Sequence, residues 1–252
     1  MVQIGCILLA AGASTRFGPP DKLTVGQYPL AERAMDSALA ADFCEYGVVV
    51  SRQETALLAA RRKMPWVINP APQRGIYSSV ALGAGMARNA EAYLFAVADQ
   101  PRMSADILRA MKAAYERGTI LRAACGEKRG NPVIFPRELL PELMQLRPGE
   151  SGRTVAKRHA SLIRNFETGD EQALEDADTP EDLFRLLEVR RFVIRGRSRF
   201  AAAALAGAEP EEERQDALLF GQKEGKEFVF DTERQEVADC AFLLKKFLQL
   251  GL

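Results

Sequence analysis

The stretch ILLAAGASTRFGPPDKL, residues 7–23, decides the fold class and points to a ligand. The apolar run of residues 2–10 ends near Gly12, and this pattern is typical of a buried strand followed by a small-residue turn. Arg16 and Lys22 follow, where backbone N–H groups can face an anion and two cations can bind phosphate oxygens. The stretch is not a Walker A loop, since GxxxxGK[ST] is absent. It predicts a phosphate site, with a tight turn and two solvated cations as the alternative.

The composition is that of an ordinary globular protein. The 252 residues are 47% apolar and 27% charged, with a formal net charge of zero. This balance gives no global reason to expect a nucleic acid or an anionic membrane as a partner. No run of about 18 apolar residues predicts a membrane span, and no secretory signal is recognised. Four widely spaced cysteines without a CxxC pair predict reduced thiols in a cytoplasmic protein.

Strand and helix patterns alternate along the first 190 residues, which predicts an α/β domain with a mostly parallel sheet. In such sheets a ligand binds beyond the carboxyl ends of the strands, where residues 12–18 and Asp99 fall. Ser104 is expected to cap a helix that ends before Gly118. The other expected helices lie at residues 29–42, 54–63, 78–88, 137–145, 151–158 and 180–190. The expected strands lie at residues 2–10, 47–51, 66–68, 93–98, 120–124, 132–135 and 162–166.

The character of the chain changes after residue 189. A stretch with five arginines at residues 190–199 is followed by an alanine-rich run and the acidic residues 209–213. A short strand at residues 227–230 and a helix at residues 233–248 are expected. We therefore predict one domain over residues 1–190 and a small C-terminal α/β extension over residues 191–252. The arginines are expected to form a solvated face, with a phosphate-bearing partner as the alternative.

Four ordered motifs in the first 190 residues resemble those of the MobA-like nucleotidyltransferase superfamily. Residues 9–23 (LAAGASTRFGPPDKL) are similar to its signature LAAGxSxRxG…K. Residues 75–80 (GIYSSV) look like its GMSSSL segment, and residues 97–101 (VADQP) look like the end of its metal-binding strand. Residues 176–183 (DADTPEDL) resemble its closing DIDTPEDL, and residues 130–133 (GNPV) also fit. The resemblance implies a Rossmann-like, three-layer αβα fold of the GT-A-like type.

Within this superfamily the chain is most similar to the molybdenum cofactor cytidylyltransferases. Guanylyl-transferring relatives usually carry a second glycine where this chain has Ala11, and asparagine-rich closing motifs where it has Asp176 and Asp178. The resemblance implies a Mg²⁺-dependent transferase that moves CMP from CTP to the terminal phosphate of molybdenum cofactor and releases pyrophosphate. The implied partners are CTP, the molybdopterin-type acceptor and a molybdenum hydroxylase that receives the product. No nucleic acid or membrane is expected.

The resemblance also implies roles for single residues. Arg16 and Lys22 would hold the β- and γ-phosphates and Asp99 would bind the metal, which makes these three the expected catalytic residues. An acceptor phosphate is already ionised, so the chemistry needs charge neutralisation and alignment rather than a strong base. Ser78 and Ser79 would approach the base or ribose, with a helix N-cap pair as the alternative. The expected nucleotide-binding residues are Leu9, Ala10, Ala11, Gly12, Ala13, Ser14, Arg16, Lys22, Gly75, Ser78, Ser79 and Asp99.

Few carboxylates and several waters would hold Mg²⁺. Asp99 is the first expected ligand because it directly follows an apolar strand, and a turn aspartate is the alternative. The second is Asp178 or Asp176, and capping of the helix that begins at Pro180 is the alternative for either.

Arg129 and Asn131, with Ser151 and Arg153 of the loop at residues 149–153, would face the acceptor. The family usually has GDxGAR in this loop, whereas this chain has GESGR. The departure leaves the identity of the acceptor open.

Two alternative functions remain at this stage. The first is another nucleotidyltransferase, of the guanylyl or the sugar-phosphate type. The GIYSSV and DADTPEDL segments argue against the sugar-phosphate type. The second is a non-catalytic carrier or chaperone of molybdenum cofactor, favoured by the changed loop and the C-terminal segment and opposed by the intact phosphate and metal residues. Among other single residues, we expect His159 and Arg74 at the surface and Trp66 in the core.

Overall fold

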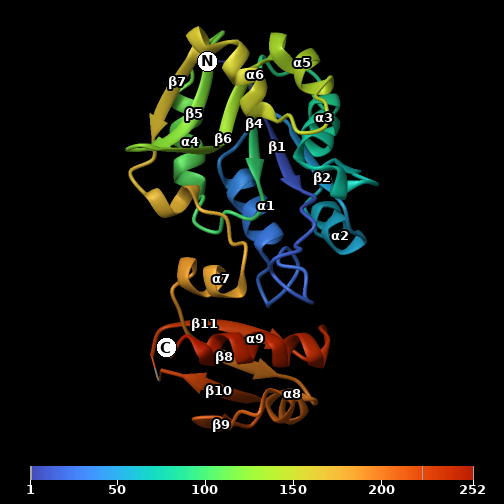
Figure 1. The fold of residues 1–252 in the computed structure, drawn as a ribbon, viewed down its shortest axis with the longest axis vertical. Coiled ribbons are helices and arrows are strands. Elements are labelled where there is room, and N and C mark those ends of the chain that lie inside the picture. The colour runs from blue at the N-terminus through green and yellow to red at the C-terminus, as the bar shows by residue number, and fades with distance from the viewer. Residues whose placement is uncertain (1, 223, 252) are drawn as a thin grey trace. The chain divides into compact units, whose positions relative to one another are not determined.

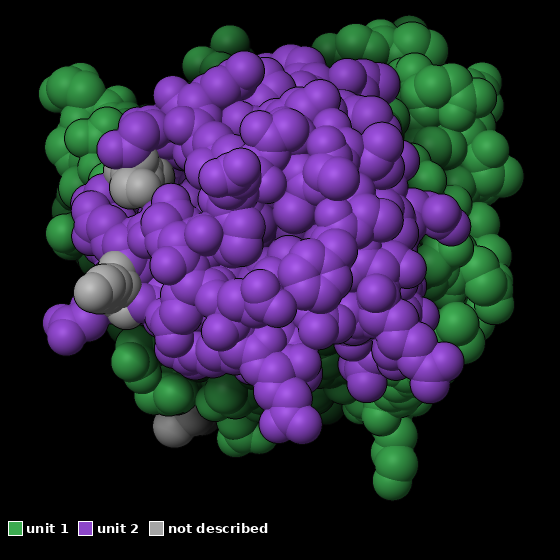
Figure 2. Space-filling view, turned by 90° about the horizontal axis from the view of Figure 1, so that it is seen from below, with its two compact units in different colours: residues 1–13, 31–175 green, residues 14–30, 176–252 purple. Residues whose placement is uncertain are grey.

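The computed structural model describes residues 2–222 and 224–251. The chain divides into two compact units, residues 1–13 with 31–175 (unit 1) and residues 14–30 with 176–252 (unit 2), which Figure 2 colours separately. The expected boundary near residue 190 falls inside unit 2, and the division into domains at that point stays a prediction. Across the described residues, no helix is both long and apolar enough to cross a membrane.

The sheet of unit 1, within the residues described, has seven strands in the order β3-β2-β1-β4-β6-β5-β7 (Figure 1). All neighbouring pairs are parallel except those of β6, which runs antiparallel to both β4 and β5. A two-residue turn with Gly126 at φ 54° joins β5 directly to β6, so this pair is a hairpin. The mostly parallel sheet is thus confirmed. The strands are β1 (Ile4–Ala10), β2 (Tyr46–Val50), β3 (Trp66–Ile68), β4 (Ala92–Val97), β5 (Ile120–Cys125), β6 (Lys128–Pro136) and β7 (Ile163–Glu167).

Helices cover the sheet of unit 1 and pack against it to form the core (Figure 1). Apolar side chains of α3, α5 and α6 join those of β1, β4 and β6 in one buried cluster. On α4, Arg109 and Lys112 donate to backbone carbonyls at the end of α1, so these two helices lie side by side. The expected α/β fold is confirmed. The helices are α1 (Leu30–Ala40), α2 (Gln53–Arg61), α3 (Ile76–Gly85), α4 (Ala105–Ala114), α5 (Leu140–Met144) and α6 (Gly152–Arg158), with 3-10 turns at Pro72–Arg74, Arg137–Leu139, Ala160–Leu162 and Glu171–Leu174.

Unit 2 has its own sheet, drawn at the orange and red end of the colour bar in Figure 1. In the part of the chain that is described, it contains four strands in the order β11-β8-β10-β9. β8 is parallel to β11 and antiparallel to β10, which is antiparallel to β9. The C-terminal α/β extension is therefore present. Its elements are α7 (Pro180–Leu186), β8 (Val189–Arg195), α8 (Arg199–Ala206), β9 (Glu212–Arg214), β10 (Ala217–Gly221), β11 (Lys226–Asp231) and α9 (Val237–Gln249).

Four phenylalanines form the aromatic core of unit 2. Phe184 of α7, Phe192 of β8, Phe228 of β11 and Phe247 of α9 are buried and lie 5.3 to 6.1 Å apart between ring centroids. Most of these pairs are edge-to-face, the geometry that the ring quadrupole favours. The closing DADTPEDL motif, which precedes and begins α7, is thereby anchored to the sheet of the C-terminal segment.

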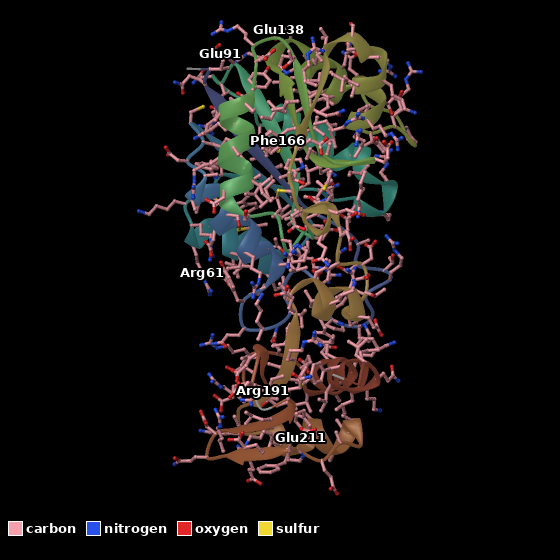
Figure 3. The ribbon with its side chains drawn as sticks, turned by 90° about the vertical axis from the view of Figure 1, so that its left-hand side faces the viewer. Arg61, Glu91, Glu138, Phe166, Arg191 and Glu211 are labelled. Atoms are coloured by element: carbon pink, nitrogen blue, oxygen red, sulfur yellow. The ribbon has the colours of Figure 1, made fainter. Side chains whose placement is uncertain are left out.

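Several expectations at the junction after α7 are wrong. The helix expected over residues 180–190 ends at Leu186, because β8 begins at Val189. Arg191, expected on a solvated face, is 7% exposed; its Nε donates to the Gln222 carbonyl at 2.8 Å and its Nη1 pairs with Glu227 (Figure 3). Arg191 lies on the same face of β8 as the buried Val189 and Val193, so it points inward, whereas the charge count alone suggested solvent.

Two further differences occur in unit 1. Trp66, expected in the core, is 41% exposed, because β3 is short and forms one edge of the sheet. The helix expected from residue 78 begins two residues earlier, at Ile76, after Gly75 at φ 109°. Few residues other than glycine adopt this backbone conformation, so Gly75 is the residue at which the chain turns into α3.

Candidate active site

The turn after β1 lies at the carboxyl end of the central strands of unit 1. β1 is buried along its whole length and runs parallel to β2 on one side and β4 on the other. Strand order therefore reverses between β1 and β4, which is where open α/β sheets bind ligands. A Cβ built on Gly12 would meet nothing within 4 Å. The fold thus leaves open space over the backbone at this turn.

Asp99 lies next to this turn within unit 1. It is half-buried in the turn that follows β4, and the N–H of Ala98 donates to the carbonyl of Leu9 at 3.0 Å. Because Leu9 pairs with Val97, the ends of β1 and β4 are in register. The structure therefore brings Asp99 to the same sheet edge as residues 10–13, as the alternation of strands predicts.

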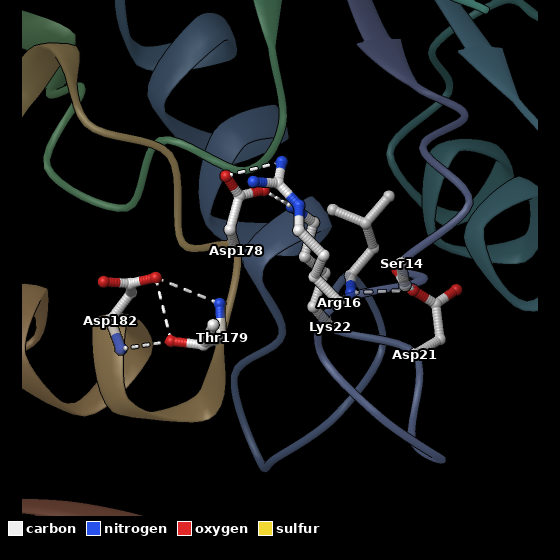
Figure 4. Close-up of polar contacts among 8 residues, drawn as sticks. Ser14, Arg16, Asp21, Lys22, Asp178, Thr179 and Asp182 are labelled. Carbon is white, nitrogen blue, oxygen red and sulfur yellow. Dashed lines mark hydrogen bonds and ion pairs between the residues drawn. The ribbon is translucent and has the colours of Figure 1, made fainter.

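The two cations of the opening stretch meet a carboxylate in unit 2 (Figure 4). Arg16 Nη2 lies 2.8 Å from Asp178 Oδ2, and Lys22 Nζ lies 3.3 Å from Asp178 Oδ1. The Arg16 side chain is 72% exposed, whereas Lys22 is only 5% exposed as a residue. Burying an unpaired ammonium costs free energy, and the ion pair with Asp178 offsets part of that cost. Lys22 is not a solvated cation.

The helix-capping interpretation of Asp178 is wrong. The N-cap of α7 is Thr179, whose Oγ1 accepts from the N–H of Asp182 at 3.1 Å, while the Asp182 carboxylate accepts from the N–H of Thr179. Burial alone would raise the pKa of Asp182, but these hydrogen bonds and Arg185 outweigh it and lower that pKa. Thr179 and Asp182 complete the capping box, so Asp178 turns its carboxylate to the cations. Asp176 is exposed.

Asp21, which sequence reasoning missed, shapes the loop that carries the cations. Its Oδ1 accepts from Ser14 Oγ at 2.7 Å and from the N–H of Leu23 at 3.1 Å (Figure 4). Ser14 has φ 52°, so this hydrogen bond accompanies a backbone conformation that is uncommon outside glycine. Ser14 therefore has a structural partner in the loop. A side chain that bonds its own loop is typical of Asx turns, which is the signal that could have found Asp21.

Ser78 and Ser79 of α3 are tied into a network with Asn69. Asn69 Nδ2 donates to both hydroxyl oxygens at 2.9 Å, and Ser78 Oγ donates to the carbonyl of Gly75 at 2.8 Å. The N-cap residue of α3 is Gly75, so the alternative of a serine N-cap pair is wrong. Asn69 is buried and holds the start of α3, and sequence reasoning missed it.

All four expected acceptor residues line one pocket of unit 1. The pocket has a volume of about 390 Å³, and Arg129, Asn131, Ser151 and Arg153 lie on its wall. Its apolar lining comes from the strands and helices of the core cluster: Leu9, Ile76, Val80, Phe95, Val133, Phe135 and Ala156. A pocket with an apolar wall and a few convergent polar groups is typical of a small-molecule site.

Arg122, which sequence reasoning missed, lines the same pocket. Burial lowers its pKa, and the neighbouring guanidinium groups of Arg129 and Arg153 lower it further. Nη2 of Arg122 donates to Asn165 Oδ1 at 3.1 Å, which fixes the guanidinium in place. Three like charges that gather around one pocket repel one another, and an anionic ligand would relieve that repulsion. Nothing in the apolar pattern of β5 marks this arginine as different from a surface one.

The altered loop at residues 149–153 is well supported in the fold. Glu150, which stands where the family usually has aspartate, accepts from the N–H of Arg147 at 2.8 Å and pairs with Arg158. Ser151 is the N-cap of α6, and its N–H donates to Thr154 Oγ1. The carboxylate at this position is thus used inside the loop, which leaves Arg153 exposed at the pocket.

Arg74 agrees with the surface expectation, whereas His159 is only partly exposed. Arg74 is exposed at the end of a 3-10 turn, and His159 is half-buried, with Nε2 2.6 Å from Glu142 Oε1. The four cysteines are free thiols. Burial raises the pKa of Cys6 and of Cys240 to about 12, so neither thiol is a ready nucleophile.

The carboxylates of the candidate site fit a metal ion that is held by few protein ligands. Within the described parts of the chain, no three His, Cys, Asp or Glu side chains gather as a group that could hold a metal. Mg²⁺ is usually held by one or two carboxylates together with substrate phosphates and water. Asp99 in unit 1 can offer one such carboxylate, and so can Asp178 in unit 2, with the remaining oxygens supplied by a nucleotide and water.

Comparison with known proteins adds a family and a fold. Residues 6–162 match the family described as MobA-like NTP transferase domain. Nicotine blue oxidoreductase of Paenarthrobacter nicotinovorans is 29% identical over 193 residues, which cover 72% of this chain and 95% of that protein.

Solved structures agree on the fold. A nucleotidyl transferase from Methanothermobacter superimposes with a TM-score of 0.65 at 20% identity, over 73% of this chain and 95% of that one. Rv0371c from Mycobacterium tuberculosis superimposes with a TM-score of 0.65 at 24% identity, over 74% of this chain and 98% of that one. Rv0371c has also been solved as a complex with manganese, with a TM-score of 0.58 at 21% identity and coverage of 74% and 98%.

Proposed function

Because the chain belongs to the family of MobA-like NTP transferase domains, we propose that it transfers CMP from CTP to the terminal phosphate of molybdenum cofactor and releases pyrophosphate. The observation that carries the proposal is the buried ammonium of Lys22, which shares the Asp178 carboxylate with Arg16. Two cations in a loop that follows a buried strand suit a triphosphate better than a solvated surface.

The reaction needs alignment and charge neutralisation. An oxygen of the acceptor phosphate attacks the α-phosphorus, a new P–O bond forms, and the bond from the α-phosphorus to the bridging oxygen breaks. The electron pair leaves with pyrophosphate, and no proton must be removed from the ionised acceptor. Arg16 and Lys22 would neutralise charge that grows on the leaving pyrophosphate. The open backbone at Gly12, with Leu9, Ala10, Ala11, Ala13 and Ser14, would line the nucleotide.

Asp99 and Asp178 are the proposed ligands of Mg²⁺. When bound, the ion would neutralise phosphate charge and orient the triphosphate. Asp178 pairs with two cations, so its carboxylate is held in one orientation before nucleotide arrives. Asp176 is exposed and stays the alternative second ligand.

The three-arginine pocket of unit 1 supports an anionic acceptor. Arg122, Arg129 and Arg153 would bind its terminal phosphate, and Asn131 and Ser151 offer uncharged polar groups for a pterin edge. The choice of CTP rests on Ala11 and on the aspartates of the closing motif, by resemblance alone. A molybdenum hydroxylase is the proposed recipient of the product.

An oxidation–reduction reaction is the second candidate function. The observation that favours it is the name of the relative from Paenarthrobacter, an oxidoreductase that matches over 95% of its length. The diphosphate of a dinucleotide could use the same two cations. The pocket of unit 1, with three arginines, argues for a phosphorylated acceptor instead.

Pyrophosphate release tests the proposal. The purified protein is incubated with Mg²⁺ and molybdenum-loaded molybdopterin, with CTP, GTP, ATP and UTP in parallel. Release with CTP alone is expected. Release with GTP alone would replace the proposal with a guanylyl transfer, and binding of CTP without release would favour a carrier of the cofactor. A parallel arm follows oxidation of NADH or NADPH with nicotine blue, and activity there alone would favour the oxidoreductase.

Replacement of Arg122 by alanine is expected to raise the KM for the acceptor by about 10- to 100-fold, since a hydrogen bond to a charged group contributes roughly 1.5–3 kcal/mol. The KM for CTP should stay unchanged, because Arg122 belongs to the acceptor pocket. Steady-state kinetics with each substrate varied in turn measure the difference. Arg164→Ala, on the neighbouring β7 and outside the pocket, is the matched control. An unchanged acceptor KM in Arg122→Ala would remove Arg122 from the site.

A further inference from the structure

The loop of residues 14–30 packs against the C-terminal segment within unit 2. Gln235, in the turn before α9, contacts the loop with both ends of its side-chain amide. Its Oε1 accepts from the N–H of Gly26 at 3.2 Å, and its Nε2 donates to the carbonyl of Thr24 at 3.0 Å. The N–H of Gln27 also donates to the carbonyl of Val229 on β11, at 2.8 Å. Two elements of the segment thus bind the backbone of the loop.

Two glycines of the loop lie against aromatic rings of the same segment. A Cβ on Gly18 would come within 2.5 Å of Phe242 of α9, and a Cβ on Gly26 would come within 2.8 Å of Phe228 of β11. Both glycines have φ values, 115° and 85°, that side chains rarely adopt. The loop is therefore shaped to the surface of the segment at positions on both sides of Lys22.

About a quarter of this chain lies outside the matches to the relatives named above. The family match ends at residue 162. The alignments with the relatives cover 95–98% of the relatives' length but only 72–74% of this chain. Gln235, Phe228 and Phe242 all lie beyond residue 162, so the family match does not include the residues that hold the loop.

We propose that the C-terminal segment positions the phosphate-binding loop, and that Gln235 is the positioning residue. This inference rests on the proposed function for the statement that the loop binds nucleotide. Gln235 bonds main-chain atoms on both sides of Val25, three residues beyond Lys22, and so restricts the loop that carries the cation. A loop held in its binding conformation before the ligand arrives loses less conformational entropy on binding. The segment would then set nucleotide affinity without touching the nucleotide.

The test compares Gln235→Met with Gln249→Met. Methionine keeps the length of the side chain and removes both hydrogen bonds. Gln249, exposed at the end of α9, is the matched control. In Gln235→Met we expect faster amide hydrogen exchange at Gly26 and Gln27, and a KM for CTP that rises about 10-fold with the acceptor KM unchanged, since each lost hydrogen bond is worth roughly 2- to 10-fold. Gln235→Glu keeps the acceptor for Gly26 and should restore slow exchange there.

The outcomes separate the inference from the proposed function. Unchanged exchange at residues 24–27 in Gln235→Met, or an unchanged KM for CTP in an active enzyme, would overturn the inference. An equal rise of both KM values would also overturn it, because a general loss of structure explains that result. If the wild type neither binds nor uses any nucleotide, the proposed function fails, while the exchange measurement still decides whether Gln235 holds the loop. Thermal unfolding checks that each variant is folded.

Discussion

Replacement of Asp99 by asparagine is expected to lower Mg²⁺-dependent pyrophosphate release by about 10³-fold, the upper end of the loss when one electrostatic contributor to a transition state is removed. Asparagine keeps the size of the side chain and removes the negative charge that a divalent cation requires. Asp99 lies in the turn after β4, at the sheet edge that also holds the open turn at Gly12. The prediction follows from this position and from the proposed role as a metal ligand.

Release is measured against Mg²⁺ concentration with CTP and the acceptor held at saturation. Asp106→Asn provides the control, since Asp106 is an exposed aspartate of α4 that pairs with Arg109. Thermal unfolding of Asp99→Asn should resemble that of the wild type, because Asp99 is only half-buried. Activity close to wild type in Asp99→Asn would show that the carboxylate is not part of the reaction.

Replacement of Lys22 by methionine is expected to lower kcat/KM for CTP by about 10²-fold, in the range found when one charge-stabilising group is removed. Methionine fills a similar volume without the ammonium group. Lys22 is 5% exposed and pairs with Asp178, so the cation is held in place before any ligand binds. The acceptor KM should be unaffected, because the acceptor residues belong to the pocket of unit 1.

Kinetics with CTP varied at a fixed acceptor concentration measure the effect. Lys245→Met is the matched control, since Lys245 is an exposed lysine of α9. Asp178 retains its ion pair with Arg16 in the Lys22 variant, and its side chain is 28% exposed, so the carboxylate is not left buried without a partner. Kinetics of Lys22→Met that match the control would mean that Lys22 serves the fold and does not bind the triphosphate.

The bounds of the first four strands could be predicted well, because they depend on the pattern of apolar residues within each strand. β3 lies at residues 66–68 as expected, and β1, β2 and β4 begin and end within about two residues of their expected bounds. The segment after residue 189 was harder. β8 and β9 are rich in charge, so arginines and glutamates mask their period-two pattern, and β10 is a five-residue apolar run with no alternation to identify it.

The residues of the candidate site likewise fall into those that the sequence could identify and those that it could not. Arg16, Lys22, Asp99 and Asp178 could be named from motifs, because each motif is a short run of residues with chemistry of its own. The helix-capping alternative for Asp178 could be dismissed only once Thr179 and Asp182 were seen to complete the capping box. Arg122 could not be named at all, since its neighbours in the pocket come from β6 and α6.

The buried first strand, the small-residue turn, the cations after it and the α/β alternation can all be predicted from the sequence, since each follows from the order of neighbouring residues. Which groups act together depends instead on contacts between distant parts of the chain. Lys22 meets Asp178 across 156 residues, and Gln235 meets Gly26 across 209 residues. Such contacts depend on how distant elements pack. This packing is determined by how buried apolar surfaces from different elements fit together, which no short stretch of sequence specifies.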